Sequence, residues 1–124
     1  MSLSAGLLAS LGTGITFLPQ EFLVHVGVRP EGPIVLVMQL LGALYLGAAI
    51  LNWMNRGTLI GGIYGRPVSM ANFSIFAIGA LALLKGLVAT RSGLEVAVIA
   101  TVYSVFAIWF GVVLFSHPVD AAPR

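Results

Sequence analysis

Four long runs of apolar residues, separated by short polar or glycine-rich stretches, fill most of this 124-residue chain. The runs cover approximately residues 3–18, 34–54, 69–88 and 95–115. A helix needs about 20 apolar residues to cross the hydrocarbon core of a bilayer. Only 8% of the residues are charged, against about a quarter in soluble domains. The sequence therefore predicts an all-α membrane protein, a compact bundle of four transmembrane helices.

The first run is the shortest, and Pro19 interrupts it. Residues 19–27 are typical of a short helix, since proline is favoured in the first turn of a helix and glycine just past its end. Phe22, Leu23 and Val26 fall on one side of this turn, so we expect a short interfacial helix after the first span. The first run has no positively charged segment before it and no A-x-A-like cleavage site after it, which favours an uncleaved helix over a secretory signal.

Size and composition exclude several classes of function. We expect one transmembrane domain over residues 1–124, with no room for a soluble module beside it. Cysteine is absent, which excludes thiolate nucleophiles, disulfide relays and thiolate metal sites. The six basic and four acidic residues form no run of like charge, so we expect no nucleic-acid partner. Membrane lipids are the expected partners, and a homo-oligomer or a larger membrane complex stays open.

Four spans place both termini and the connection of residues 55–68 on one side of the membrane. His25 and His117 then lie on opposite sides, about 30 Å apart, and cannot share a metal ion; we expect no metal and no cofactor. Positive charges near the spans are balanced between the two sides, with Arg56, Arg66 and Arg124 on one and Arg29, Arg91 and Lys85 on the other. Because Lys85 lies inside a helix and counts least, we expect cytoplasmic termini, in a bacterial inner membrane.

Polar side chains within the spans are the first candidates for a ligand site. Tyr45 and Asn52 share a face of the second run, and Asn72 lies in the third. Such residues usually join helices by hydrogen bonds, and the alternative is that these three converge on a buried polar site. Lys85 is the one ionisable residue well inside a span. It either has a functional role, or it extends its long side chain to the headgroups or pairs with Glu95 across the hairpin between the third and fourth runs.

The connection of residues 55–67 is both apolar and rich in glycine, and it contains Arg56, Tyr64 and Arg66. If it folds back onto the helices as a re-entrant segment, the two arginines are candidates to bind lipid phosphates or an anionic ligand. If it lies flat in the interface, they sit among the headgroups. The sequence leaves both alternatives open.

Small residues recur along the third and fourth runs, and such stripes let helix backbones approach closely. They are Gly79 and Gly86 in the third run and Ala97, Ala100, Ser104, Ala107 and Gly111 in the fourth. Ser92 and Glu95 form an S-x-x-E pattern, which predicts a capping box at the start of the fourth helix.

The first half of the chain combines a short first run, a Pro-x-x-Phe-Leu turn that ends in glycine, and a second run that reads Gln39-Leu-Leu-Gly42-Ala-Leu-Tyr-Leu-Gly47. In these features it resembles the DoxX-like group of small four-helix membrane proteins, some of which are similar to subunits of quinone-linked sulfur oxidoreductases. Members often have a carboxylate near the start of the second helix, where this chain has Gln39, and an arginine early in the first helix, which this chain lacks. The resemblance therefore implies no catalytic residue here.

Taken together, these features favour a non-enzymatic integral membrane protein, either an accessory subunit or a bundle that binds lipid or a small ligand. A small transporter or channel subunit that acts as an oligomer is a second hypothesis. A quinone-linked membrane oxidoreductase subunit is a third, based on the family resemblance and on Tyr45, Trp53 and Tyr64. Aromatic residues near helix ends are more often anchors in the membrane interface.

Overall fold

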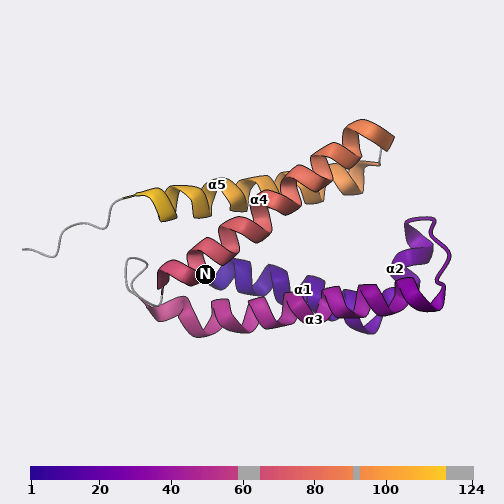
Figure 1. Ribbon diagram of the computed structural model, residues 1–124, viewed down its shortest axis with the longest axis horizontal. Helices are drawn as coiled ribbons and strands as arrows, with labels where there is room; N and C mark the ends of the chain where they lie inside the picture. The colour runs from indigo at the N-terminus through magenta and orange to yellow at the C-terminus, as the bar shows by residue number, and fades with distance from the viewer. Residues whose placement is uncertain (59–64, 91–92, 117–124) are drawn as a thin grey trace, which may run out of the picture. The chain divides into compact units, whose positions relative to one another are not determined.

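The computed structural model describes residues 1–58, 65–90 and 93–116, and every regular element in these ranges is helical (Figure 1). The elements are α1 (Ser2–Phe17), α2 (Pro19–His25), α3 (Gly32–Met54), the 3₁₀ turn η1 (Asn55–Gly57), α4 (Gly65–Thr90) and α5 (Leu94–Phe115). Three helices, α3, α4 and α5, are long and apolar enough to cross a membrane, and the bent pair α1 and α2 supplies a fourth candidate if it counts as one span. The all-helical class is confirmed for the described residues, as is the presence of three to four helices long and apolar enough to span a membrane.

The four expected spans correspond closely to α1, α3, α4 and α5. The largest difference is in α4, which begins at Gly65, four residues before the expected start. Pro67 lies in its first turn, where the missing N–H costs no helical hydrogen bond, so proline does not prevent this earlier start. The N-cap of α5 is Gly93, which has no side chain to cap the helix. Ser92 of the predicted capping box lies outside the described residues. Glu95 still lies in the first turn, where a negative charge is favourable.

The chain divides into two compact units, Met1–Gly57 and Thr58–Arg124. In the first unit α1 packs along α3, and in the second α4 packs along α5 (Figure 1). The described helices thus form two pairs, and their assembly into one four-helix bundle stays a prediction.

In the first unit, α1 and α3 run antiparallel. Ser4 near the start of α1 contacts Asn52 near the end of α3, and Gly12 contacts Gly42 in the middle. Apart from the adjacent pair Ser4 and Ala5, the buried residues of α1 follow one another at spacings of three or four, as in helices that pack along a narrow seam: Ser4, Ala5, Leu8, Gly12 and Ile15. This register places the end of α3 beside the beginning of the chain.

A sharp bend separates α1 from α2, which meet at 94°. Pro19 opens α2 and has no N–H with which to continue α1. At the other end of α2, Gly27 has a φ of +78°, its N–H donates to Val24 O, and the Val28 N–H donates to Leu23 O. These two bonds around a left-handed glycine form a Schellman motif. The helix predicted from Pro19 and Gly27 is therefore confirmed, whereas its interfacial position stays a prediction.

The second unit is held together by aromatic side chains. Phe76 of α4 is fully buried, and its ring stacks on those of Phe106 and Phe110 with centroids 4.9 and 5.9 Å away. Tyr103 meets the same ring edge-on at 5.3 Å. A Cβ atom on Gly79 would lie 2.6 Å from the Tyr103 ring, so the absence of a side chain there lets the ring approach α4.

Candidate functional site

A chain of two hydrogen bonds joins the end of α3 to the start of α1. Asn52 Nδ2 donates to Ser4 Oγ at 3.1 Å, and Ser4 Oγ donates to the Met1 carbonyl oxygen at 2.8 Å. The side chains of Asn52 and Ser4 are 1% and 0% exposed. A buried polar group without a partner would be costly, so this pairing fixes the register of the two helices. Asn52 therefore joins α3 to α1 by a hydrogen bond between helices.

Halfway along the same pair, two glycines bring the backbones of α1 and α3 together. A Cβ atom on Gly12 would lie 2.9 Å from the Gly42 carbonyl oxygen, and one on Gly42 would lie 2.9 Å from the Gly12 carbonyl oxygen. Thr16, one turn after Gly12, also packs against Gly42. Any side chain at either glycine would force the helices apart, and so the close approach requires both of them.

Beside this seam lies an apolar groove of about 390 Å³. Its α1 side consists of residues with small side chains, and its α3 side carries Leu46, Ile50 and Trp53. The small residues are Ser2, Ala5, Gly6 and Ala9. The groove exists because this face of α1 carries only small side chains, whereas large side chains project from α3.

Arg56 lies next to the Trp53 end of this groove. Its Cζ atom is 4.0 Å from the centroid of the Trp53 ring, and its Nη1 donates to the Trp53 carbonyl oxygen at 2.7 Å. Arg56 is nevertheless exposed. A tryptophan paired with a cation at the end of an apolar helix is typical of the headgroup level of a membrane.

The remaining candidates are distributed over both units. Tyr45 is half-buried on α3 and thus shares a unit with Asn52 and Arg56. Arg66 is exposed in the first turn of α4, and Lys85 is exposed five residues before the end of α4. The described contacts therefore place Asn52 and Arg56 near the same end of α3.

In the second unit, Asn72 is 3% exposed, and its Nδ2 donates to the Val68 carbonyl oxygen at 2.8 Å. This bond to a residue four positions earlier stays within α4. Tyr64 lies outside the described residues, as do residues 59–63 of the same connection. Whether the connection is re-entrant or interfacial thus also lies outside them.

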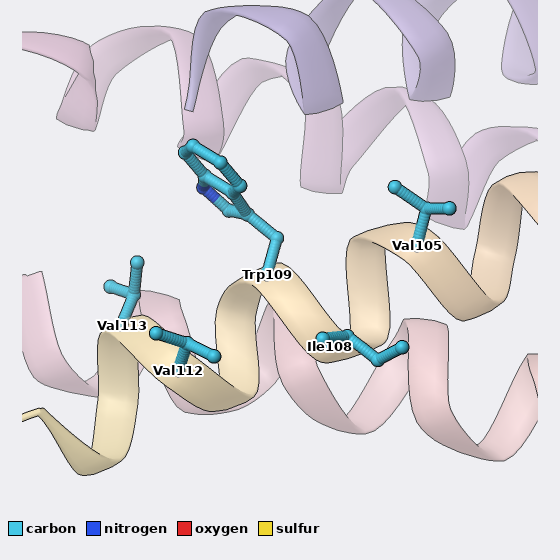
Figure 2. Close-up of a pocket in the computed structure, with 5 residues that line it drawn as sticks. All are labelled: Val105, Ile108, Trp109, Val112 and Val113. Carbon is cyan, nitrogen blue, oxygen red and sulfur yellow. The ribbon is translucent and has the colours of Figure 1, made fainter.

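A second apolar hollow, of about 360 Å³, is lined by described residues of α5. Figure 2 shows Val105, Trp109 and Val113 projecting from the same side of this helix, as residues four apart do. Ile108 and Val112 also line it, and the lining is almost entirely apolar, with the indole of Trp109 as its one residue that carries a polar atom in the side chain among those described. Trp109 is 65% exposed, so this face is suited to hydrocarbon contact.

The groove and the pairing of Arg56 with Trp53 were not predicted from the sequence. Both have a signal in the sequence. Ser2, Ala5, Gly6 and Ala9 are small residues at helical spacing, and Trp53 and Arg56 are three apart, the separation at which helical side chains meet. Among the residues described, no group of three or more His, Cys, Asp or Glu side chains could hold a metal ion.

Comparison of the chain with protein-family models, with curated proteins and with solved structures found no match. The DoxX-like resemblance therefore stays a prediction. The basis for a functional proposal is the exposure of the helices and the geometry of the first unit.

Proposed function

We propose that this chain is a non-enzymatic integral membrane protein that binds membrane lipid through its helix pairs. One observation carries the proposal. In the most apolar part of each long helix, only 11% of the residues of α3, 17% of α4 and 17% of α5 are buried inside the protein. Leu44 on α3, Val88 on α4 and Ile108 on α5 are 72%, 85% and 69% exposed. So much apolar surface is unfavourable in water, whereas lipid or neighbouring membrane helices cover it at no such cost.

The arrangement proposed in the membrane has four spans, α1, α3, α4 and α5. The 23 residues of α3 extend about 34 Å, enough to cross a hydrocarbon core of about 30 Å. Since α2 turns 94° away from α1, it lies along the membrane surface if α1 crosses the bilayer. Its exposed polar residues, Gln20, Glu21 and His25, suit that position. The termini are cytoplasmic in this proposal, and the membrane is a bacterial inner membrane.

The DoxX-like resemblance supports the same proposal, because that group consists of small four-helix membrane proteins. Gln39, which occupies the position where members often have a carboxylate, is exposed on α3. No catalytic role is assigned to it. An accessory role in a larger membrane complex would use the same exposed helix faces.

Extraction of cell membranes tests the proposal directly. We expect the full chain to stay in the membrane pellet in alkaline carbonate, because carbonate removes proteins held by charge but does not dissolve a bilayer. Mild detergent should then release it. Release by carbonate alone would contradict the proposal.

The natural absence of cysteine makes the topology measurable. Single substitutions at exposed positions, Ser2→Cys, Val28→Cys and Thr58→Cys, provide one thiol at a time for a membrane-impermeant maleimide applied to intact cells. We expect labelling of Val28→Cys and protection of the other two until the membrane is permeabilised. If Ser2→Cys is labelled together with Val28→Cys, α1 does not cross the membrane and the proposed topology is wrong.

A further inference from the structure

We infer that the groove between α1 and α3, together with Arg56 at its end, is a binding site for one anionic phospholipid. An acyl chain occupies the groove, and the lipid phosphate binds the Arg56 guanidinium. The inference rests on the proposed function, because it requires the chain to be surrounded by lipid.

The shape of the groove fits a hydrocarbon chain. It follows α3 from Leu46 to Trp53, a rise of about 10 Å, and its lining is almost entirely apolar. Opposite these residues, Gly6 of α1 leaves open space, since a Cβ atom there would have no heavy atom within 4 Å. A flexible chain fills such a narrow hollow without any change in the packing of α1 against α3.

The charge at the groove end fits a phosphate. The guanidinium of Arg56 is planar and exposed, and it has more N–H donors than its bond to the Trp53 carbonyl uses. Such a group binds phosphate through two parallel hydrogen bonds. Both carboxylates of the first unit, Glu21 and Glu31, precede α3, whereas Arg56 follows it. Neither therefore competes for the arginine at its groove end.

Trp53 connects the two parts of the site. Its ring lines the groove and also lies 4.0 Å from the Arg56 Cζ atom, which holds the guanidinium at the level where the groove ends. An apolar helix from a partner would fill the groove but would bring no anion to Arg56. A phospholipid supplies both the apolar chain and the negative charge.

Native mass spectrometry of the full chain in mild detergent tests the charged part of the site. The probes are phosphatidylglycerol and phosphatidylcholine with identical acyl chains. We expect the protein to retain one phosphatidylglycerol in preference to phosphatidylcholine, and Arg56→Gln to reduce this preference about fivefold. Arg29→Gln is the matched control, because it removes the same charge before the start of α3, about 35–40 Å from Arg56 along the helix. Equal effects of the two substitutions would overturn the inference.

Two glycine substitutions on one helix test the apolar part. Gly6→Leu places a side chain in the groove, whereas Gly14→Leu places the same side chain about 12 Å away on α1, outside the groove. A Cβ atom has no neighbour within 4 Å at either position, so both variants should fold. We expect Gly6→Leu to lose both lipids and Gly14→Leu to retain them. If Gly6→Leu does not fold, Ala9→Leu fills the same groove.

The outcomes separate this inference from the proposed function. Two results would overturn the lipid site. The first is that Gly6→Leu still retains lipid. The second is that the oligomeric mass of Gly6→Leu changes while its lipid content does not, which would assign the groove to another copy of the chain. In either case the protein still resists carbonate extraction, and the proposed function stands. Release by carbonate would overturn the proposed function itself.

Discussion

A single methyl group added at Gly42 should destabilise the first unit. A Cβ atom there would lie 2.8 Å from the Thr16 backbone nitrogen and 2.9 Å from the Gly12 carbonyl oxygen. It would also meet the Thr16 hydroxyl oxygen. Because two of these three are backbone atoms, rotation of a side chain cannot relieve the overlap. Helices α1 and α3 must separate by about 0.5 Å to restore ordinary van der Waals distances.

The magnitude follows from two opposing effects. Overpacking at tightly packed sites usually costs about 1–3 kcal/mol, and a gap of this size forfeits a quarter to a half of the van der Waals attraction where it opens. Alanine is the better helix former by up to about 1 kcal/mol. We therefore expect Gly42→Ala to lower the free energy of unfolding of the first unit by about 1–2 kcal/mol, which is about a five- to thirtyfold change in the equilibrium.

Tryptophan fluorescence measures this change in one unit at a time. The chain has two tryptophans, Trp53 in the first unit and Trp109 in the second. In a Trp109→Phe background, Trp53 alone reports unfolding as sodium dodecyl sulfate is titrated into mild detergent micelles. Trp109 is 65% exposed, so its replacement should disturb little.

Gly47→Ala is the matched control for Gly42→Ala. Gly47 is exposed on the same helix, and a Cβ atom there has no neighbour within 4 Å. We expect Gly47→Ala to be neutral or to stabilise the unit by up to about 1 kcal/mol. If both variants unfold at the same detergent fraction, the close approach of α1 and α3 at Gly42 is refuted.

Three further substitutions probe the hydrogen bonds, the aromatic cluster and the end of α2. Asn52→Leu should cost about 1 kcal/mol in the Trp53 assay, the usual value of a hydrogen bond between membrane helices, and Gln39→Leu on the exposed face should cost nothing. Phe76→Ala removes three ring contacts from the second unit and should lower its free energy of unfolding by about 2 kcal/mol when Trp109 is the reporter. A loss of stability reported by Trp53 alone would contradict the assignment of these contacts to the second unit. Gly27→Ala forces a side chain into a φ of +78° and should cost about 1–2 kcal/mol, and a stability equal to wild type would argue against the Schellman motif.

The positions of the helices could be predicted because each has a local cause. Apolar runs long enough to span a bilayer became α3, α4 and α5, and Pro19 and Gly27 marked the two ends of α2. No local feature of the sequence determines which helices pack against each other. The helices are apolar on all sides, so no polar face indicates which side meets a neighbour. That α1 packs along α3 is shown by contacts in the structure, the hydrogen bond of Asn52 to Ser4 and the close approach of Gly12 to Gly42.

The same limit explains what was missed in the sites. Asn52 stands out among apolar residues and was predicted to bond between helices, but nothing local identifies Ser4 as its partner. Gly79 was noticed as a small residue, whereas the Tyr103 ring that packs against it was not. The sequence around an aromatic residue in an apolar helix does not show whether its ring packs inside the protein or faces lipid. By contrast, the contact of Arg56 with Trp53 is local and was predictable from their spacing.

Rescue experiments should separate the two kinds of packing. At Gly79 an added Cβ atom meets only the side chain of Tyr103, so Tyr103→Leu should restore most of the stability that Gly79→Ala loses. At Gly42 the obstructing atoms include the backbone of Thr16, and hence Thr16→Ala should restore little. Double-mutant cycles with Trp109 and Trp53 as the respective reporters measure both coupling energies. Equal rescue at the two glycines would mean that the contact of α1 with α3 is made by side chains, contrary to the geometry of Gly12 and Gly42.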